Sequence, residues 1–460
     1  MFFSLFEAHP ERTAILSDSG TSLTYADLYS ACLFFRNAIP PRSLILFLAD
    51  RSVQSLALYY CALSENCVLL PLDEKTPPSV VERFIHFYRP EYIWCRTEQI
   101  KNFQCIADTA FIKGDHGLFK SLYPSVRLHK DLALLLTTSG STGNPKTVRI
   151  SYTNLLENTK AILEALSLED GAIGPTTLPI QYTYGAAICN MHFAVGGTLL
   201  VTERTVLDPY FHAFIRENNL TNIQGVPYIH EMLDRVGFYN NLPATLSLVT
   251  MGGGQAPKRL QIKMNQILKE HGIRFAALYG QTEGTTMLTK IPDWLEMNEP
   301  GCIGVACKGM KAAVDPNTNE LVFSGSSVCM GYAESADDLQ KGNENHGILR
   351  TGDLARMDER GCIYLTGRIK RIIKLAGIRV NLDDVETIAA EIFGGAECAC
   401  CGSENAMVVF QSASTDTFKA KQLLADRLRI SQAMFRIEYL EEIPRKGNGK
   451  IDYPSLERLQ

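Results

Sequence analysis

The stretch TTSGSTGNPK at residues 137–146 is the most informative part of the chain. It is a run of glycines and small hydroxylated residues that ends in Pro145 and Lys146. An apolar run at 132–136 precedes it and an alternating run at 147–150 follows it, so we expect a loop between two strands. Glycines let the backbone approach anionic oxygens, hydroxyls donate hydrogen bonds, and lysine adds a charge. The loop is predicted to hold a polyphosphate.

Two other interpretations of this loop were weighed. The GxxxxGK[ST] loop of nucleoside triphosphatases does not fit, because Pro145 precedes Lys146 and a strand is expected to follow. This argues against an ordinary motor or kinase. A solvated hairpin loop is the alternative, since Gly, Ser, Asn and Pro also mark simple turns.

Length and composition indicate a globular protein with more than one domain. The chain has 460 residues, more than the ~250 to 300 at which one core stops growing. Its formal net charge of −5 gives no basic stripe, which argues against nucleic acid or an anionic membrane as the main partner. No apolar run reaches the ~20 residues of a membrane span. A cytoplasmic location is therefore expected.

The 13 cysteines show no spacing typical of a disulfide module. A chain of this size does not need disulfides for stability, so reduced thiols are expected. Cys398, Cys400 and Cys401 form a cluster, but it lacks a CxxC partner pair and a nearby His. We expect a strand of small residues there rather than a metal site.

Helix and strand patterns alternate through the first part of the chain and predict βαβ units with a parallel sheet. In a first α/β lobe, strands are expected at residues 43–50, 68–72 and 92–95, and helices at 53–63 and 77–88. In a second lobe, helices are expected at 151–166, 187–194 and 257–271, and strands at 198–202, 246–251 and 275–278. Short β-like pieces at 299–331 predict a small barrel or sheet. After residue 379, a compact α+β module is expected, with helices near 382–392 and 418–428.

A second chemical stretch follows the strand expected at 275–278. Tyr279, Gly280, Gln281, Thr282 and Glu283 stand at its carboxyl end, where open α/β sheets bind their ligands. The tyrosine offers a flat face, the threonine a hydroxyl for a phosphate, and the glutamate a hard oxygen for Mg²⁺. Taken alone, the pattern also fits a tight turn with a surface carboxylate.

Two basic stretches lie near the C-terminus. The first contains Arg368, Lys370, Arg371, Lys374 and Arg379 with no acidic residue between them. Such a run is usually a solvated face, and a role at an anionic ligand requires the company of Asp353, whose carboxylate suits a ribose diol. The second is the loop PRKGNGKID at 444–452, which presents Lys450. A simple basic turn is its alternative interpretation.

Five motifs together resemble the signatures of the adenylate-forming superfamily, which includes acyl-CoA synthetases, peptide-synthetase adenylation domains and firefly luciferase. They are TSGSTGNPK at 138–146, YGQTE at 279–283, RTGDL at 350–354, GRIKRIIKLAGIRV at 367–380 and NGKID at 448–452. The resemblance implies an α/β fold with a large N-terminal domain, residues 1–369, of two α/β lobes and a distorted β-barrel. It also implies a small mobile α+β domain at 370–460, a hinge at Lys370 and an active site between the two domains.

The resemblance further implies roles for single residues. The phosphate loop would hold the β- and γ-phosphates of ATP through Thr138, Ser139, Gly140, Ser141, Thr142, Gly143 and Lys146. Tyr279, followed by Gly280 and Gln281, would pack on adenine. Thr282 would contact the α-phosphate, and Glu283 would bind Mg²⁺. Asp353 would hold the ribose with help from Arg368. Lys450 would bridge the substrate carboxylate and the α-phosphate, and Gly377 would form part of a pantetheine passage.

This assignment agrees with the physics of the reaction. A carboxylate that attacks a phosphate meets like-charge repulsion, so a metal ion and a cation are needed where charge develops. No covalent nucleophile is required. We expect no catalytic triad, and the nine histidines are expected to be structural or surface groups.

Departures from the family pattern bear on the substrate. Tyr182 stands where acyl-CoA synthetases often carry His, and Thr183 stands near where amino-acid-activating domains carry an ammonium-binding Asp. An α-amino acid is therefore disfavoured. The acyl pocket is expected to be apolar and to suit an acyl or aryl acid. Its expected lining is Tyr182, Tyr184, Gly225, Val226, Pro227, Gly252, Gly253 and Gly254, and the last three are also assigned to the nucleotide. Tyrosines that only pack are the alternative.

The predicted function is an acid–thiol ligase. It would form an acyl adenylate from a carboxylic acid and ATP with release of pyrophosphate, and transfer the acyl group to CoA or to the phosphopantetheine of a carrier protein. A C-terminal module that is shortened around 398–409, together with Tyr182, favours the carrier protein. Two alternatives stay open: luciferase-type oxidation of the adenylate, and a non-catalytic nucleotide-binding protein.

Overall fold

The computed structural model of the chain describes residues 9–137, 146–254, 256–292, 301–375, 378–403, 406–413, 417–428, 430–446 and 449–459. The chain forms two compact units. The first consists of Met1–Asn298, Gly304–Ala312 and Phe323–Leu349, and the second of Glu299–Ile303, Ala313–Val322 and Arg350–Gln460. The boundary predicted between residues 369 and 370 lies inside the second unit. The hinge at this boundary remains a prediction.

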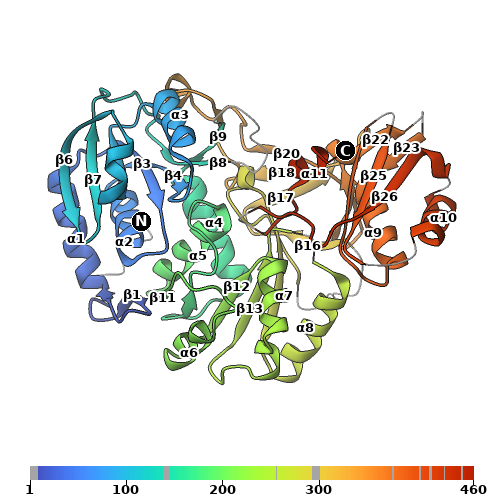
Figure 1. The fold of residues 1–460 in the computed structure, drawn as a ribbon. Coiled ribbons are helices and arrows are strands. Elements are labelled where there is room, and N and C mark those ends of the chain that lie inside the picture. Colours follow the sequence, from blue (N-terminus) through green and yellow to red (C-terminus); the bar gives the residue numbers. More distant parts are fainter. Residues whose placement is uncertain are drawn as a thin grey trace. The chain divides into compact units, whose positions relative to one another are not determined.

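The first unit contains an eight-stranded sheet (Figure 1). Its order is β19 (Gly331–Ala333), β9 (Thr147–Ser151), β8 (Leu132–Thr137), β4 (Val68–Asp73), β3 (Leu44–Ala49), β5 (Tyr92–Arg96), β7 (His116–Ser121) and β6 (Ile106–Lys113). The strands β8, β4, β3 and β5 are parallel, as the βαβ pattern predicted. The four outer strands are added in antiparallel fashion.

Helices cover both faces of this sheet, which explains the continuous apolar runs in its central strands. In β3, Ile45 and Phe47 belong to a core shared with α1 (Tyr25–Ala38), α2 (Val53–Ser64), α4 (Tyr152–Leu166) and α5 (Thr183–Ala194). Leu46 and Leu48 belong to a second core, shared with α3 (Pro78–Tyr88). Successive side chains of a strand point to opposite faces, so one strand supplies both cores.

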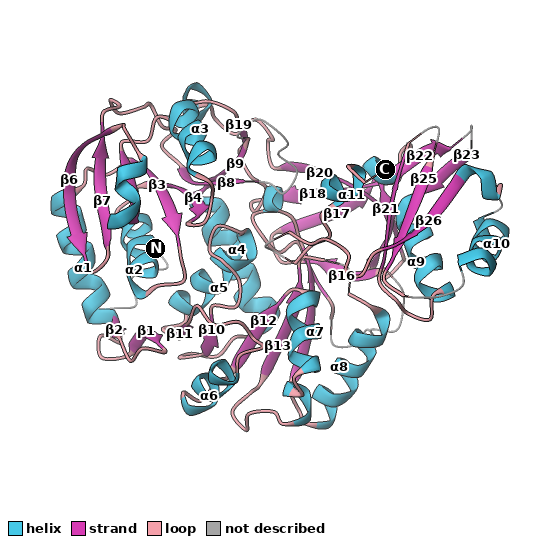
Figure 2. Ribbon diagram, in the orientation of Figure 1, coloured by secondary structure: helices cyan, strands magenta, loops and turns pink. Residues whose placement is uncertain are grey.

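Two further groups of strands complete the first unit (Figure 2). One is the sheet β10 (Ile173–Pro175), β11 (Thr198–Val201), β1 (Thr13–Ser17) and β2 (Ser22–Thr24). The other consists of the first four strands of a nine-stranded sheet, in the order β12 (Asn222–Gly225), β13 (Leu248–Gly252), β14 (Arg274–Tyr279) and β15 (Thr289–Lys290). Around them lie α6 (Pro209–Glu217), α7 (Pro227–Arg235) and α8 (Lys258–Glu270). The predicted second lobe is therefore present. The N-cap of α4 is Ser151, whose side chain accepts a hydrogen bond from the backbone of Asn154.

The chain passes between the two units within the short strands β16 (Cys302–Ala306), β17 (Met310–Val314), β18 (Glu320–Gly325) and β20 (Ile348–Met357). In the second unit, β20 and β21 (Ile363–Arg368) form an antiparallel hairpin. It is followed by the pair β22 (Ile372–Leu375) and β23 (Ile378–Asn381), and by the sheet β24 (Cys398–Gly402), β25 (Met407–Gln411) and β26 (Phe435–Tyr439). Its helices are α9 (Leu382–Ile392), α10 (Thr417–Leu428) and α11 (Tyr453–Glu457).

The cysteine cluster forms β24, as the strand interpretation predicted. All 13 cysteines lie in the described residues and are free thiols. Among the helices of the described residues, none has the length and apolar character needed to cross a membrane.

Candidate functional site

The turn that follows β14 carries the second predicted motif. Tyr279 ends the strand, and its ring stacks near that of Phe323, with the centroids 6.2 Å apart. Gly280 is required by close packing, because a Cβ atom there would lie 1.5 Å from the carbonyl oxygen of Thr286. Gln281 donates from Nε2 to the hydroxyl of Tyr279 at 3.2 Å. The turn is therefore compact and holds the aromatic ring in a fixed place.

Thr282 and Glu283 follow in a short 3₁₀ helix, Thr282–Gly284. One oxygen of the glutamate, Oε1, accepts a hydrogen bond from the hydroxyl of Tyr332 at 2.8 Å. The backbone carbonyl of Glu283 accepts from the N–H of Cys329 at 2.9 Å. Both contacts come from the segment around β19, which sequence reasoning had not singled out.

The same tyrosine also contacts the end of the predicted phosphate loop. The ammonium nitrogen of Lys146 lies 4.1 Å from the centre of the Tyr332 ring and 3.4 Å from Oε1 of Glu334. On either side of the loop, β8 and β9 are paired with Thr137 opposite Thr147, so the predicted strand–loop–strand geometry is present. The predicted phosphate-binding residues Thr138, Ser139, Gly140, Ser141, Thr142 and Gly143 lie outside the described residues.

The residues predicted to line an acyl pocket come from three neighbouring elements. A Cβ atom on Gly252 would lie 3.6 Å from the Tyr184 ring, one on Gly253 3.2 Å from Val226, and one on Gly254 3.6 Å from Pro227. The structure therefore brings the first turn of α5, the segment that starts α7 and the end of β13 together. Gly225 ends β12 beside this segment.

The two tyrosines of this region differ in their surroundings. Tyr184 shares a hydrogen bond of 2.6 Å with the hydroxyl of Thr250, and burial raises the pKa of its phenol, which stays neutral. Tyr182 precedes α5, and burial followed by the charge of Asp73 raises its pKa. Both oxygens of Asp73 are already used, one by the N–H of Lys75 and the other by the amide of Gln181.

In the second unit, Asp353 and Arg368 face each other across the β20–β21 hairpin. The guanidinium Nε lies 3.0 Å from Oδ1 of the carboxylate, which is nearly buried. The sequence had assigned both residues to the same ribose, and the structure brings them together. Lys370 lies in the short 3₁₀ helix Ile369–Arg371. The predicted passage residue Gly377 lies outside the described residues.

Lys450 lies on a tight hairpin of the second unit. Arg445 pairs with Ile451 in an isolated bridge, and the carbonyl of Lys450 accepts from the N–H of Lys446 at 2.8 Å. Gly449 has a positive φ of 77°, which favours glycine at this turn. The predicted lysine is thus exposed at the end of a well-connected loop.

Arg371 corrects one part of the sequence interpretation. The basic run was expected to be a solvated face or a ligand contact, but the Arg371 side chain is only 13% exposed. It pairs at 2.5 Å with both Asp383 and Glu386 of α9. Burial raises the pKa of Glu386 to about 7 even though Arg371 opposes this shift. Arg371 is therefore a structural residue of the second unit.

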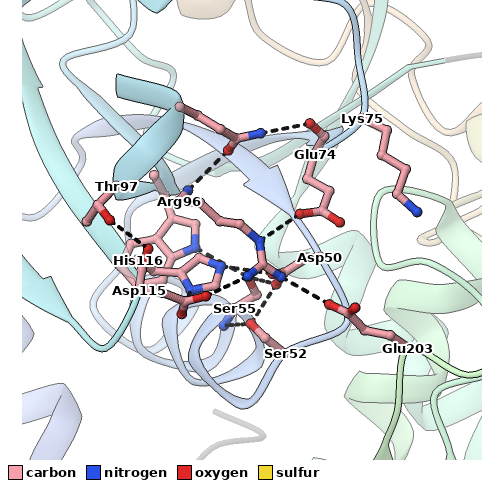
Figure 3. A network of polar contacts seen from close by, with 12 residues as sticks. Asp50, Ser52, Ser55, Glu74, Lys75, Arg96, Thr97, Asp115, His116 and Glu203 are labelled. Carbon is pink, nitrogen blue, oxygen red and sulfur yellow. Dashed lines mark hydrogen bonds and ion pairs between the residues drawn. The ribbon is translucent and has the colours of Figure 1, made fainter. Parts of the chain in front are cut away.

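A second polar network of the first unit involves none of the predicted site residues. Figure 3 shows the guanidinium of Arg96 among carboxylates that include Asp50 and Glu74. His116 lies between Asp50 and Asp115, with one ring nitrogen near each carboxylate, and the hydrogen bonds to them raise its pKa despite its burial. Its ring stacks on Trp94. This network fastens β3, β5 and β7 to one another.

Comparison with known proteins identifies the family. The family model described as AMP-binding enzyme matches residues 2–333. The chain belongs to the AMP-binding enzyme family. This match confirms the predicted superfamily, and it contains the Lys146, Glu283 and Tyr332 contacts. Asp353, Arg368 and Lys450 lie beyond the matched residues.

Two curated relatives of this AMP-binding enzyme are named as a synthetase and a ligase, in agreement with the predicted ligase class. The Delta-poly-L-ornithine synthetase of Acinetobacter baumannii is 24% identical over 97% of this chain, which spans only 35% of that protein's length. The D-alanine–D-alanyl carrier protein ligase of Lacticaseibacillus casei is also 24% identical, over 97% of this chain and 96% of the ligase.

Among solved structures, MatB from Rhodopseudomonas palustris with bound ATP has a TM-score of 0.82 to this chain. Its sequence is 20% identical, and the match covers 100% of this chain and 98% of MatB. At this identity the likeness concerns the fold, and it confirms the predicted α/β fold class.

Proposed function

We propose that the protein is an ATP-dependent acid–thiol ligase that activates a carboxylic acid as its acyl adenylate, releases pyrophosphate and transfers the acyl group to a thiol. The observation that carries the proposal is the link between two predicted motifs of an AMP-binding enzyme. Through Tyr332, the carboxylate of Glu283 is connected to Lys146 at the end of the phosphate loop. A carboxylate for a metal and an ammonium for a phosphate at one place suit a nucleoside triphosphate.

The residues of this region fit a magnesium ion that is shared with the nucleotide. Mg²⁺ is usually bound by one or two carboxylates together with substrate phosphates, and not by a complete protein cage. The single carboxylate of Glu283 suits this mode. When bound, Mg²⁺ would neutralise charge on the phosphates.

Each protein residue has a definite task in the proposed reaction. Tyr279, fixed by its turn, packs on adenine, and Thr282 donates to the α-phosphate. Asp353 and Arg368 hold the ribose hydroxyls. The ammonium of Lys450 draws the substrate carboxylate and the α-phosphate together and offsets the charge that grows as they react. All of these groups act by position and charge, so no covalent enzyme intermediate is formed.

We propose an apolar acyl or aryl acid as the substrate, without an α-ammonium group. The neighbours of Gly252, Gly253 and Gly254 are the ring of Tyr184 and the apolar side chains of Val226 and Pro227. Thr183, near the place where amino-acid-activating domains carry an ammonium-binding Asp, begins α5 and brings no carboxylate to this region. The names of the two relatives contain amino acids, ornithine and D-alanine, and so do not support this choice, but at 24% identity they do not decide the substrate of this chain.

For the acceptor, we propose the phosphopantetheine thiol of a carrier protein, with free CoA as the alternative. The proposal rests on Tyr182 in place of His and on the short C-terminal module. The free thiols and the use of ATP suit a cytoplasmic enzyme.

The first experiment is the exchange of labelled pyrophosphate into ATP with a broad panel of carboxylic acids. We expect exchange with an acyl or aryl acid and none with α-amino acids. No exchange with any acid would overturn the ligase assignment.

A thioester assay with the accepted acid then offers free CoA and a panel of phosphopantetheinylated carriers side by side. Transfer to CoA with none to any carrier would overturn the preferred acceptor, and formation of the thioester without oxygen excludes the luciferase-type alternative.

The variant Gly377→Trp tests the second half-reaction. If residue 377 forms part of the thiol passage, a bulky side chain will block thioester formation and spare pyrophosphate exchange, because Lys450 acts in the other half-reaction. Equal loss of both activities would contradict a separate passage.

A further inference from the structure

We propose that Tyr332 is a positioning residue that orients Glu283 for Mg²⁺ and supports Lys146 at the phosphates of ATP. This inference rests on the proposed function, from which it takes the roles of Glu283 and Lys146. It adds a residue from outside the predicted motifs and states what that residue does.

The two contacts of the side chain use different parts of it. The hydroxyl donates to Oε1 of Glu283 at 2.8 Å, which is a normal length for a hydrogen bond to a carboxylate. The ring face lies under the ammonium of Lys146 at 4.1 Å from the ring centre, within the range of a cation–π contact. One tyrosine therefore contacts both the anionic and the cationic partner of the proposed metal–phosphate site.

The backbone holds this tyrosine firmly even though its side chain is 38% exposed. Tyr332 pairs with Val148 in the antiparallel β19–β9 ladder, and its carbonyl accepts from Nε of Arg149 at 3.0 Å. Arg149 is fully buried and is itself held by Glu344. Since β9 begins directly after Lys146, the ladder fixes the tyrosine relative to the end of the phosphate loop.

The segment before β19 holds the other partner. The N–H of Cys329 donates to the carbonyl of Glu283, and the hydroxyl of Thr285 donates to the carbonyl of Ser327 at 2.6 Å. The backbone and the side chain of Glu283 are therefore both tied to residues 327–332. Motion of the carboxylate relative to Lys146 is restricted from both sides.

The two contacts support each other electrostatically. A cation over the ring face withdraws electron density and makes the phenol a stronger donor to the carboxylate. An ordinary phenol keeps its proton near neutral pH, so the hydroxyl of Tyr332 is available as a donor. A hydrogen bond to one carboxylate oxygen restricts rotation and leaves the group preorganised for a metal ion.

The test separates the hydroxyl from the ring with two variants. Tyr332→Phe keeps the ring under Lys146 and removes the donor to Glu283, whereas Tyr332→Leu removes both. We measure ATP affinity by calorimetry over a series of Mg²⁺ concentrations, and pyrophosphate exchange over the same series. For Tyr332→Phe we expect the half-saturating Mg²⁺ concentration to rise about 3- to 10-fold, as for the loss of one hydrogen bond, with an exchange rate at saturating Mg²⁺ near that of the wild type. For Tyr332→Leu we expect an additional loss of ATP affinity.

Tyr210→Phe is the matched control. Tyr210 is also an exposed tyrosine of the first unit with a cation over its ring, that of Arg204 at 4.8 Å, but its partner Arg204 is not one of the predicted site residues. We expect its Mg²⁺ dependence to equal that of the wild type. An unchanged Mg²⁺ dependence in Tyr332→Phe would overturn the proposal.

A second background makes the assignment to Glu283 specific. In a Glu283→Gln protein, Tyr332→Phe should shift the Mg²⁺ dependence no further, because the carboxylate that it orients is gone. A full shift in this background would overturn the link between the two residues. Calorimetry reports on this inference even if no acid supports exchange, so failure of the ligase assignment and failure of the Tyr332 assignment give different results.

Discussion

The guanidinium of Arg371 lies 4.2 Å from the centre of the Tyr453 ring. The residue after the predicted hinge Lys370 is thereby packed against the start of α11, three positions beyond Lys450. The hydroxyl of Tyr453 also donates to Glu386 at 3.1 Å, and Glu386 pairs with Arg371. Within the second unit, these contacts tie the predicted hinge to the loop of the predicted catalytic lysine.

Arg371→Gln is expected to destabilise the protein by about 3 to 5 kcal/mol, because it leaves a buried carboxylate without its charge partner. The pKa of Glu386 is already raised, to about 7. This carboxyl group therefore lowers the stability of the folded protein as the pH rises from the ordinary pKa of a glutamate toward 7. Loss of Arg371 raises that pKa further, and the variant should lose more stability at pH 8 than at pH 5.5. Urea unfolding at the two pH values measures this.

Arg427→Gln is the control, because Arg427 and its partner Glu391 are both exposed, and a change within about 0.5 kcal/mol is expected. An equally stable Arg371→Gln protein would show that the cluster contributes little.

Lys450→Ala is expected to lower the rate of pyrophosphate exchange by ~10² to 10³, as for other groups that stabilise developing charge. ATP binding should stay nearly intact, because the proposed phosphate and ribose contacts come from other segments. Calorimetry and the exchange assay together separate the two effects. Lys446→Ala, on the same hairpin, should exchange at close to the normal rate. Wild-type exchange in Lys450→Ala would refute the assigned role.

Glu334→Gln is expected to improve ATP binding. The carboxylate of Glu334 pairs with Lys146 at 3.4 Å and competes with the phosphates for the same ammonium. Both side chains are largely exposed, so the pair is worth at most about 1 kcal/mol, and the KM for ATP should fall by up to about 5-fold. The gain should shrink at high salt, where exposed charges are screened. Glu157→Gln, which removes the exposed pair with Lys160, should leave the KM unchanged. A higher KM in Glu334→Gln would mean that Glu334 helps to place the lysine instead.

Two buried histidines are expected to reduce the stability of the protein as the pH falls from about 6.5 toward 4, because they stay neutral in the folded state, whereas the raised pKa of Glu386 acts in the opposite direction over this range. Burial lowers the pKa of both His192 and His230 to about 4, so below pH 6.5 the unfolded chain binds protons that the folded chain does not. Each contributes a slope of about 1.4 kcal/mol per pH unit in that window. Denaturant unfolding at pH 7.5, 6 and 5 measures the slope. His230→Gln retains a donor for the Thr250 carbonyl and an acceptor for the Tyr239 hydroxyl without a titration in this range, so its slope should be shallower. An identical slope would exclude His230 as a source.

The central parallel sheet was predictable because its strands are short apolar runs bounded by helices with regular spacing. The outer strands β6 and β7 were missed, since the residues 106–113 alternate irregularly and carry several polar side chains. β7 is specified by pairing with β5, and β6 by pairing with β7, and no local pattern shows either pairing. The positions of these two strands thus depend on pairing between residues that are far apart in the sequence, which sequence periodicity does not show.

The candidate site likewise contains residues that local sequence patterns pointed to and residues that they missed. Glu283 was identified because it follows a strand at its carboxyl end, and Asp353 and Arg368 because their motifs were distinctive. Tyr332 was missed because β19 has only three residues, and its partners stand 49 positions or more away in the sequence. Arg371 was misjudged for a similar reason, since its acidic partners stand 12 and 15 residues later, on α9.

The way in which the apolar clusters are distributed along the chain has a consequence for recombination between genes of this family. Two apolar clusters of the second unit draw, among the described residues, only on positions from Ile373 to Leu456. A gene segment grafted from a relative at codon 370 would bring these clusters complete. A crossover between codons 323 and 349 would in addition separate Arg350 from Asp315 and Glu320, its ion-pair partners in the earlier part of the chain. Chimeras that take their C-terminal segment from a relative are therefore expected to fold when the two genes are joined at codon 370. They are expected to be unstable when the genes are joined between codons 323 and 349.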